Sequence, residues 1–294
     1  MENIKNRSLV GFALGDIIGV PYEFKKRGTF RCDDLRRSTY KDAHFILPKG
    51  CWSDDTSLML CTLDALKGKT KEKIYKRWRR NAIEWFLFGK YTNHGFRIPY
   101  DVGKSCRAGI ISMMFHTKNK KAGDIHSNGN GGLMRILPIA FLPTDDPEEI
   151  LEYIHIFNSC SHNHLISNIG CLIYILFAKK LLAGSSVEDA LKSLSSTVDK
   201  KYQIPEYNRL WTGSLLCAAR HEIGSTGYVV HSLEAAIWCL FRSSNFEEAI
   251  LLAVNLGGDT DTIAALTGGL AGIVYDEIPE RWTKCIRRKH LLSV

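Results

Sequence analysis

Apolar residues recur at helical spacing along almost the whole chain, whereas the two-residue alternation that is typical of strands is rare. Ser53 or Asp54, for example, can cap a helix on which Leu58, Cys61 and Leu66 share one face. The pattern predicts an all-α fold. The predicted helices cover residues 6–13, 54–67, 74–86, 102–113, 133–142, 147–160, 165–183, 187–194, 205–221, 232–241, 246–254, 263–272 and 279–289.

Glycines, prolines and charged residues interrupt this pattern at a few places. We expect the first helix to end at Gly15 and Asp16. Residues 25–50 are charged and finish in a Leu-Pro-Lys-Gly turn signal, so they are predicted to form a loop. No linker, low-complexity tract or fixed-period repeat divides the chain. We therefore predict one compact multi-helix domain over residues 1–294, with its motif loops gathered on one side.

The composition is that of an ordinary globular protein, with 294 residues of which 45% are apolar and 24% charged. The apolar stretch 9–20 is short and contains Asp16, which is unlike a signal peptide. The longest apolar run, residues 169–178, is too short to span a bilayer. The nine cysteines form no C-x-x-C pair, and several have apolar neighbours. We expect a cytoplasmic protein with reduced core thiols and no membrane span.

The formal net charge of +8 is concentrated in residues 25–37 and 67–80. Such stretches suit nucleic-acid binding, solvated helix faces or attraction of an anionic small substrate. No recognised nucleic-acid motif accompanies the charge, so nucleic acid is not the expected partner.

Two segments far apart in the chain combine carboxylates with hydroxyls: residues 52–56 read Trp-Ser-Asp-Asp-Thr, and residues 257–262 read Gly-Gly-Asp-Thr-Asp-Thr. Each alone could be a capped helix start. If the four carboxylates converge, they repel one another unless cations lie between them. Oxygen ligands without a nearby histidine or cysteine cluster suit Mg²⁺ or Mn²⁺ better than zinc.

Neighbouring helical residues do not share a face. Asp54 and Asp55 therefore aim at two ions, or one binds metal while the other orients water, and the same holds for Asp259 and Asp261. A site with two metal ions about 3.5–4 Å apart satisfies this pattern.

Six segments of the chain, which follow one another in the family's order, resemble the ADP-ribosylglycohydrolase family. Within this family they are most similar to the dinitrogenase reductase-activating glycohydrolases, which are ADP-ribosylarginine hydrolases. The resemblance runs from Gly11 to Trp282. It implies an all-α fold with two Mg²⁺ or Mn²⁺ ions in a cleft lined by loops and helix N-termini. The matching segments are residues 11–19 with 21–24, 52–56, 101–109, 129–135, 161–164 and 257–262.

The resemblance also implies roles for individual residues. Glu23 matches a catalytically important glutamate near the metals. Ser53 stands where the family usually has threonine, and it keeps the hydroxyl group. The implied metal ligands are Ser53, Asp54, Asp55, Asp259, Asp261 and Thr262. The residues in segments that hold ADP-ribose are Gly129, Asn130, Gly131, Met134 and His162. Without the resemblance, the Gly-Asn-Gly segment would more often be a simple turn, and His162 would more often be a packed or capping histidine.

Asp101 bears on which bond is cut. The resemblance implies that its carboxylate meets the guanidinium of a modified arginine, for which a carboxylate is a bidentate partner. Capping of the following helix is the alternative, and both roles can coexist.

We predict a metal-dependent hydrolase that cleaves the N-glycosidic bond of mono-ADP-ribosylated arginine on a protein. Glu23 or an aspartate would move the proton, and the sequence does not assign which.

Two other functions remain open. The chain could be an immunity or binding protein that neutralises an ADP-ribosyltransferase toxin or captures its target. It could also be a hydrolase of ADP-ribose linked through oxygen to serine. The expected partners are an ADP-ribosylated protein and, for the immunity function, an ADP-ribosyltransferase.

Overall fold

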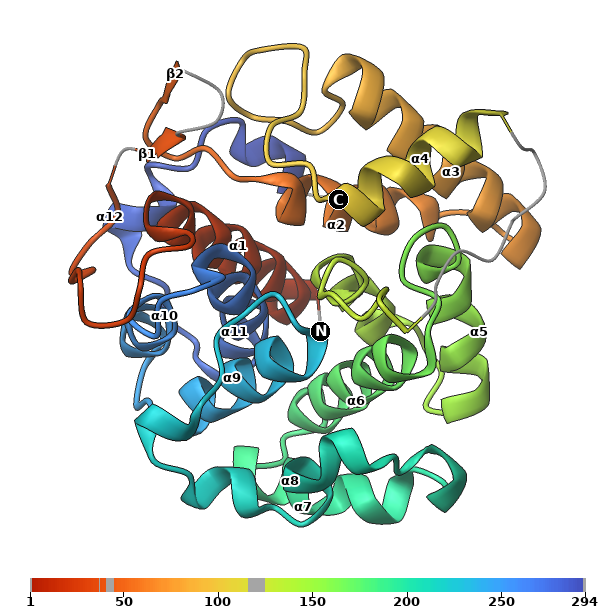
Figure 1. Ribbon diagram of the computed structural model, residues 1–294, viewed down its shortest axis with the longest axis vertical. Helices are drawn as coiled ribbons and strands as arrows, with labels where there is room; N and C mark the ends of the chain where they lie inside the picture. The colour runs from red at the N-terminus through yellow and green to blue at the C-terminus, as the bar shows by residue number, and fades with distance from the viewer. Residues whose placement is uncertain (1, 37, 41–44, 116–124, 293–294) are drawn as a thin grey trace.

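Helices make up nearly all of the regular structure, which confirms the predicted fold class (Figure 1). The computed structural model describes residues 2–36, 38–40, 45–115 and 125–292. Its α-helices are α1 (Glu2–Gly19), α2 (Asp54–Ala65), α3 (Lys71–Phe88), α4 (Lys104–Phe115), α5 (Pro147–Asn158), α6 (Leu165–Leu182), α7 (Val187–Thr197), α8 (Asn208–Trp211), α9 (Val229–Phe241), α10 (Phe246–Val254), α11 (Thr260–Val274) and α12 (Glu280–Thr283). Short 3₁₀ helices include η1 (Val20–Tyr22), η3 (Leu133–Arg135) and η4 (Leu137–Phe141).

Glycines let α1 and α11, from opposite ends of the chain, pack closely against each other (Figure 1). A Cβ atom on Gly15 would overlap the carbonyl group of Ala264 and lie 2.6 Å from the backbone nitrogen of Ala265. A Cβ atom on Gly19 would meet the backbone of Asp261 in the same way. The approach is therefore open only to glycine, and it brings the end of α1 beside the start of α11.

Polar side chains start several helices, at the predicted residue in α2, α5 and α10 and three residues earlier than predicted in α3. The Ser53, Thr70, Asp146 and Asn245 side chains each accept a hydrogen bond from a backbone N–H in the first turn of the following helix. Such caps satisfy donors that have no partner within the helix. The apolar faces of these helices then pack into one large buried cluster, with α6 near its centre.

The first helix does not end at Gly15 and Asp16, so that prediction is wrong. Helix α1 continues to Gly19 because its glycines fit the backbone of α11 and because Asp16 finds hydrogen-bond donors on α2. Tertiary contacts therefore outweigh the local stop signal.

Several other predicted elements also differ. Residues 25–50 contain a short antiparallel hairpin, in which β1 (Ser38–Tyr40) pairs with β2 (Phe45–Leu47). The helix predicted over 133–142 is two 3₁₀ helices, and 205–221 is divided into α8 and three 3₁₀ turns. The last predicted helix, 279–289, is the short α12 followed by turns. Pro138 and Gly213 interrupt the first two of these helices, and residues 280–289 are mostly polar and lack a long continuous apolar face.

One helix in the described residues, α6, is long and apolar enough to cross a membrane by length and composition. Its 18 residues extend beyond the ten-residue apolar run, 169–178, from which we predicted that no segment spans a membrane. In the protein, 78% of its residues are buried, as in the core helix of a soluble protein. All nine cysteines are free, and seven of them are buried, as predicted.

Candidate active site

The N-terminus of α2 presents its two aspartates in different directions. Ser53 Oγ accepts a hydrogen bond from the Asp55 backbone N–H at 3.2 Å. Both aspartates are buried, but Asp54 lines a cavity, whereas the Asp55 carboxylate accepts a hydrogen bond from Thr262 Oγ1 at 3.2 Å. The divergence expected for adjacent helical residues is therefore present.

Asp16, in the last turn of α1, joins that helix to the start of α2. One carboxylate oxygen accepts the Ser53 N–H at 2.9 Å. The other accepts the Thr56 N–H at 3.0 Å and the Thr56 hydroxyl at 2.6 Å. A carboxylate at a helix N-terminus satisfies free donors and interacts favourably with the helix dipole, so Asp16 fixes the direction in which α2 begins.

Asp259 occupies the position before α11 without capping it. Its Oδ2 accepts a hydrogen bond from Asn130 Nδ2 at 2.7 Å, and the same Nδ2 also donates to Ser232 Oγ at 2.9 Å. The Asp259 N–H donates to the carbonyl oxygen of Ser225 at 2.8 Å. Asn130, which was expected to bind substrate, therefore orients a carboxylate of the site through its side chain.

Three carboxylates from three helices form what we call the deep cluster: Asp16 on α1, Asp55 on α2 and Asp261 on α11. Each offers an oxygen, and these oxygens lie within 4.8 Å of one another. All three side chains are buried. Carboxylates this close in a medium of low dielectric repel strongly unless a proton or a cation lies between them.

A second group, which we call the outer cluster, consists of Glu23, Asp101 and Asp261. Each offers a carboxylate oxygen, and these oxygens also lie within 4.8 Å of one another. Asp261 belongs to both clusters. Glu23 and Asp101 are half-buried and lie on irregular segments. Asp101 has φ of 54° and Phe24, the residue after Glu23, has φ of 59°, in the left-handed region that non-glycine residues rarely adopt. The Phe24 N–H donates to the carbonyl oxygen of Gly258 at 2.7 Å, which ties this segment to the loop before α11.

Burial and mutual repulsion raise the pKa values of these carboxyl groups. Burial is the main cause for Asp16, whose pKa rises to about 6. Burial, and then the charge of the neighbouring Asp101, raises the pKa of Glu23 to about 10. Burial and like charges also raise the pKa values of Asp54, Asp55 and Asp261 well above the ordinary range. The array therefore takes up protons when no cation is present.

A cavity of about 320 Å³ opens over the outer cluster. Lys104 and Ser105, at the start of α4, form part of its wall. The remaining predicted site residues on its wall are Asp54, Asp259, Asp261, Thr262, Gly129, Asn130, Gly131, Met134 and His162. The structure thus brings residues from six separate sequence segments to one cavity.

The family model for ADP-ribosylglycohydrolases matches residues 6–294. The chain belongs to the ADP-ribosylglycohydrolase family. It is similar to the ADP-ribosylarginine hydrolase Tri1 of Serratia proteamaculans (strain 568), with 28% identity over 289 residues that cover 97% of this chain and 76% of the relative. It is also similar to the ADP-ribosyl-(dinitrogen reductase) glycohydrolase of Rhodospirillum rubrum, with 25% identity over 278 residues that cover 94% and 87% of the two chains.

The chain is also similar to a solved structure that is named after the same family. The chain matches an ADP-ribosylglycohydrolase-related protein complex with a TM-score of 0.78 and 26% identity, over 99% of this chain and 94% of the other. The predicted family membership is therefore confirmed. The ADP-ribosylglycohydrolases are hydrolases, and this chain has a cluster of acidic residues that could hold metal.

The local structure around some site residues of this ADP-ribosylglycohydrolase differs from the prediction. Helix α4 begins at Lys104, two residues later than predicted, so Asp101 lies three residues before the helix. The Gly-Asn-Gly segment leads into the three-residue η3, not into a long helix. Sequence reasoning missed Asp16 as a member of the deep cluster. The signal for it was a carboxylate within an apolar, glycine-spaced helix, where only a distant partner could satisfy it.

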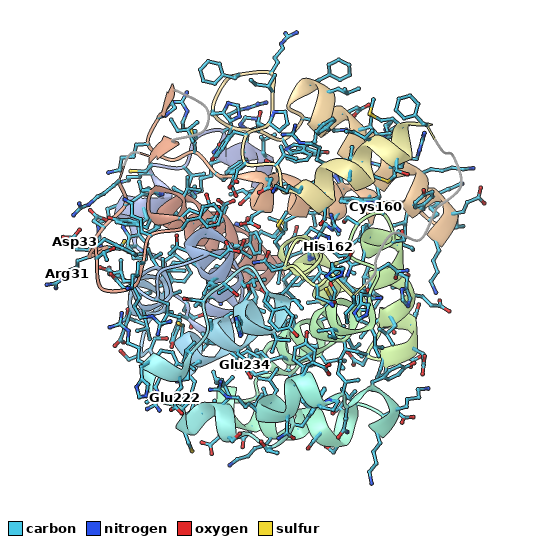
Figure 2. All side chains as sticks on the ribbon, in the orientation of Figure 1. Arg31, Asp33, Cys160, His162, Glu222 and Glu234 are labelled. Atoms are coloured by element: carbon cyan, nitrogen blue, oxygen red, sulfur yellow. The ribbon has the colours of Figure 1, made fainter. Side chains whose placement is uncertain are left out.

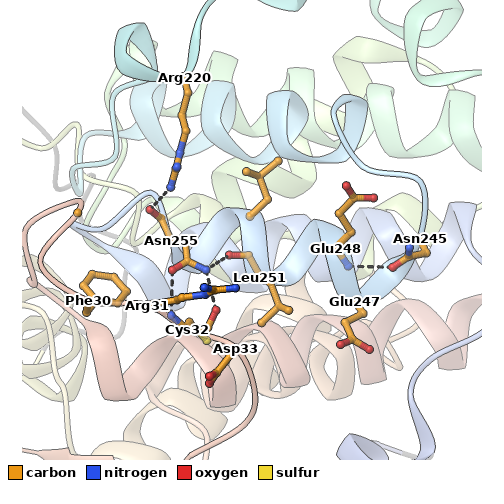
Figure 3. Close-up of a pocket in the computed structure, with 12 residues that line it drawn as sticks. Phe30, Arg31, Cys32, Asp33, Arg220, Asn245, Glu247, Glu248, Leu251 and Asn255 are labelled. Atoms are coloured by element: carbon orange, nitrogen blue, oxygen red, sulfur yellow. Dashed lines mark hydrogen bonds between the residues drawn. The ribbon is translucent and has the colours of Figure 1, made fainter.

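A larger hollow of this ADP-ribosylglycohydrolase lies elsewhere, between residues 28–33 and α10, with a volume of about 950 Å³ (Figure 3). Its acidic side chains have partners within the chain: Glu248 accepts a hydrogen bond from Ser244 Oγ at 2.7 Å, and Glu247 pairs with Arg281 at 2.5 Å. The carboxylates do not converge there, so the smaller cavity is the candidate active site.

Proposed function

We propose that this protein is a divalent-metal-dependent hydrolase that cleaves the N-glycosidic bond between ADP-ribose and an arginine side chain of a protein. The observation that carries the proposal is the outer cluster, where Glu23 and Asp101 lie beside Asp261 at the cavity. A carboxylate in that position suits a guanidinium group, which it can bind through two parallel hydrogen bonds. The arginine-directed name of the Serratia relative supports the same substrate.

The two clusters fit a pair of Mg²⁺ or Mn²⁺ ions. Their donor set is made of oxygens, which these ions prefer. The raised pKa values of Asp55 and Asp261 reflect burial and then repulsion between like charges, and cations would remove the repulsion. When bound, the ions would bind ribose hydroxyls and lower the pKa of a coordinated water. The residues proposed to hold them are Ser53, Asp54, Asp55, Asp259, Asp261 and Thr262, with Asp16 completing the deep cluster.

Glu23 and Asp101 are proposed to act on the bond that breaks. Asp101 would bind the guanidinium and orient the scissile nitrogen. Glu23, next to both Asp101 and Asp261, would move a proton between the attacking water and the leaving nitrogen. The positive charge that builds on the ribose ring during cleavage is favoured by the surrounding carboxylates.

The rest of the cavity wall is proposed to hold the ADP-ribose. Gly129, Gly131, Met134 and His162 line it beside the carboxylates. Asn130 contributes indirectly, because its amide orients Asp259. The cavity thus combines an acidic part for ions and ribose with a neutral part for the remainder of the nucleotide.

The test is release of ADP-ribose from a protein that carries ADP-ribosylated arginine. We expect release with Mg²⁺ or Mn²⁺, its loss on addition of a chelator, and its return when excess metal is restored. A matched substrate with serine-linked ADP-ribose should be cleaved much more slowly. Absence of release under every metal condition would contradict the proposal, and faster release from serine would reject arginine as the substrate.

A further inference from the structure

Arg135 is a buried cation without a carboxylate partner among the residues that the structure describes. Its side chain is 0% exposed, and its guanidinium lies over the Trp78 ring at 5.4 Å. Nη1 lies 3.8 Å from Cys106 Sγ, and Nη2 donates a hydrogen bond to Ser161 Oγ at 2.8 Å. A buried charge without a counterion is costly, so the polar contacts of the Arg135 guanidinium are needed to offset that cost. The strongest of these contacts is the hydrogen bond to Ser161.

Ser161 connects Arg135 to His162. The Ser161 Oγ lies 2.8 Å from His162 Nδ1, and both residues are 4% exposed. Figure 2 shows His162 near Cys160, in the segment between α5 and α6. The thiol of Cys160 lies 3.6 Å from the same oxygen, and Cys106 is also a neighbour.

The hydrogen bonds around Ser161 determine the tautomer of His162. A hydroxyl group has one hydrogen to donate and two lone pairs. A guanidinium can only donate, so Arg135 takes up one lone pair of Ser161 Oγ. The Cys160 thiol donates to the same oxygen at 3.6 Å and takes up the other, which leaves the Ser161 hydrogen for another acceptor. His162 Nδ1 is the strongest acceptor within reach, because thiol sulfur accepts weakly. An imidazole that accepts at Nδ1 is neutral and carries its proton on Nε2.

The Nε2 edge of His162 faces the Gly-Asn-Gly segment of the candidate active site. A Cβ atom on Gly131 would lie 3.0 Å from Nε2, and one on Gly129 would lie 3.4 Å from it. All three residues line the cavity. In the described part of the chain, the hydrogen bond of the ring is the one at Nδ1. The proton on Nε2 is therefore available to a ligand.

We infer that Arg135 and Ser161 are positioning residues that hold His162 as a neutral ring with its proton on Nε2, ready to donate a hydrogen bond to an oxygen of ADP-ribose. The contact with ADP-ribose rests on the proposed function, whereas the tautomer does not. His162 is thus a permanent donor and takes no part in proton transfer during hydrolysis.

Charge supports the same arrangement. Burial, and then the positive charge of Arg135, lowers the pKa of His162 to about 3. The other titratable groups that face Ser161 are the thiols of Cys106 and Cys160, and burial raises the pKa of Cys106. Arg135 is therefore the ionised group that bears on the ring, and it disfavours the imidazolium form.

The decisive experiment is ¹⁵N NMR of the full-length protein with labelled histidine, in which His162→Gln identifies the signal by its absence. In the wild type we expect the Nε2–H tautomer, unchanged from about pH 8 down to about pH 5. A ring protonated at Nδ1, or one that titrates near the ordinary histidine pKa of about 6.5, would overturn the inference. This readout does not depend on hydrolysis, so it separates failure of the inference from failure of the proposed function.

Ser161→Ala tests the relay, and Ser159→Ala is its matched control. Ser159 is equally buried and donates to the Ile156 carbonyl oxygen, away from His162. In Ser161→Ala we expect a mixture of tautomers and about five- to tenfold weaker binding of ADP-ribose by calorimetry with Mg²⁺ present. The control should match the wild type. Equal spectra and affinities for the two variants would overturn the inference.

Arg135→Lys and Arg135→Met separate charge from shape. Lysine keeps the positive charge and a donor for Ser161, so the Nε2–H tautomer should persist. Methionine removes both, so the pKa of His162 should rise. A His162 pKa that stays the same in a folded Arg135→Met variant would overturn the role of Arg135. If that variant does not fold, the spectra of the wild type and of Ser161→Ala still decide the inference.

Discussion

The deep and outer clusters share Asp261 but are built in different ways. The deep cluster takes its other carboxylates from helices α1 and α2, which hydrogen bonds and close packing hold in place. The outer cluster takes Glu23 and Asp101 from irregular segments that are half-exposed and include left-handed backbone positions. Such positions cost about 1–2 kcal/mol each and persist where the surrounding contacts hold them.

Because the two clusters are built differently, they suit two different tasks within one site. Rigid helices suit groups that must converge on ions, because repulsion between them has to be resisted in the folded state. Loop residues suit groups that meet a variable part of a substrate, because they can change without disturbing the core. We therefore expect the deep cluster to govern metal binding and the outer cluster to govern which bond is cut.

The largest effect should come from Asp261→Asn, because Asp261 is the residue common to both clusters. We expect Mn²⁺ binding to be lost by calorimetry and the hydrolysis rate to fall by about 1,000-fold or more. Asp276→Asn, an exposed aspartate that pairs with Arg7, is the control and should behave as the wild type. Threefold or smaller losses in Asp261→Asn would show that the clusters do not share a metal ligand.

Asp101→Ala should separate the two clusters. We expect hydrolysis of modified arginine to fall by about 100-fold, while the affinity for Mn²⁺ changes by less than about threefold. Asp33→Ala, which removes an exposed carboxylate paired with Arg36, is the matched control. Parallel loss of metal binding and activity in Asp101→Ala would remove its assignment to the guanidinium.

Gly15→Ala tests the packing on which the deep cluster depends. The added methyl group would meet the backbone of Ala264, so we expect the free energy of unfolding to fall by about 2–3 kcal/mol in urea denaturation. Gly103→Ala is the control in the outer part of the site, since a Cβ atom there meets no neighbour within 4 Å. Equal stability of the two variants would contradict the assigned role of the α1–α11 contact.

The smallest expected effect is the pH dependence of the metal-free protein. The pKa of Glu23 is raised to about 10 in the folded state, so the folded state binds this proton more tightly than the unfolded state does. Stability then falls as pH rises above the unfolded value of about 4.3 toward 10. His162, whose folded pKa is lowered to about 3, costs stability only below the unfolded histidine pKa of about 6.5.

Thermal unfolding between about pH 7 and pH 8 therefore reports mainly on the carboxylates. Above about pH 8.5 the buried thiols, whose pKa values burial also raises, add to the same fall in stability because they ionise in the unfolded state. We expect the Tm of the metal-free protein to drop by a few degrees between about pH 7 and pH 8, and Mn²⁺ to raise the Tm and flatten the curve. A metal-free Tm that rises with pH would contradict the burial and repulsion that we assign to the carboxylates of the two clusters.

The sequence allowed prediction of the features that depend on local rules. Ser53 caps α2, and the two distant aspartate pairs come close together at the starts of α2 and α11: Asp54, Asp259 and Asp261 line one cavity, and Asp55 belongs to the deep cluster. The family resemblance supplied Glu23 and Asp101, which no spacing rule would have joined to those pairs.

Features that depend on distant partners could not be read from the sequence. Gly15 and Asp16 look like a helix end, and only the backbone of α11 and the N–H groups of α2 explain why the helix continues. Asn130 likewise looks like a turn residue until its amide is seen to bind Asp259, 129 positions away. Local propensity cannot register such contacts.

The most direct test of the account is anomalous diffraction from crystals of the protein grown with Mn²⁺. The account predicts two Mn²⁺ peaks enclosed by the carboxylates of the deep and outer clusters, with Asp261 in contact with the pair. The absence of Mn²⁺ from these carboxylates at saturating metal, or its presence at another site alone, would contradict it.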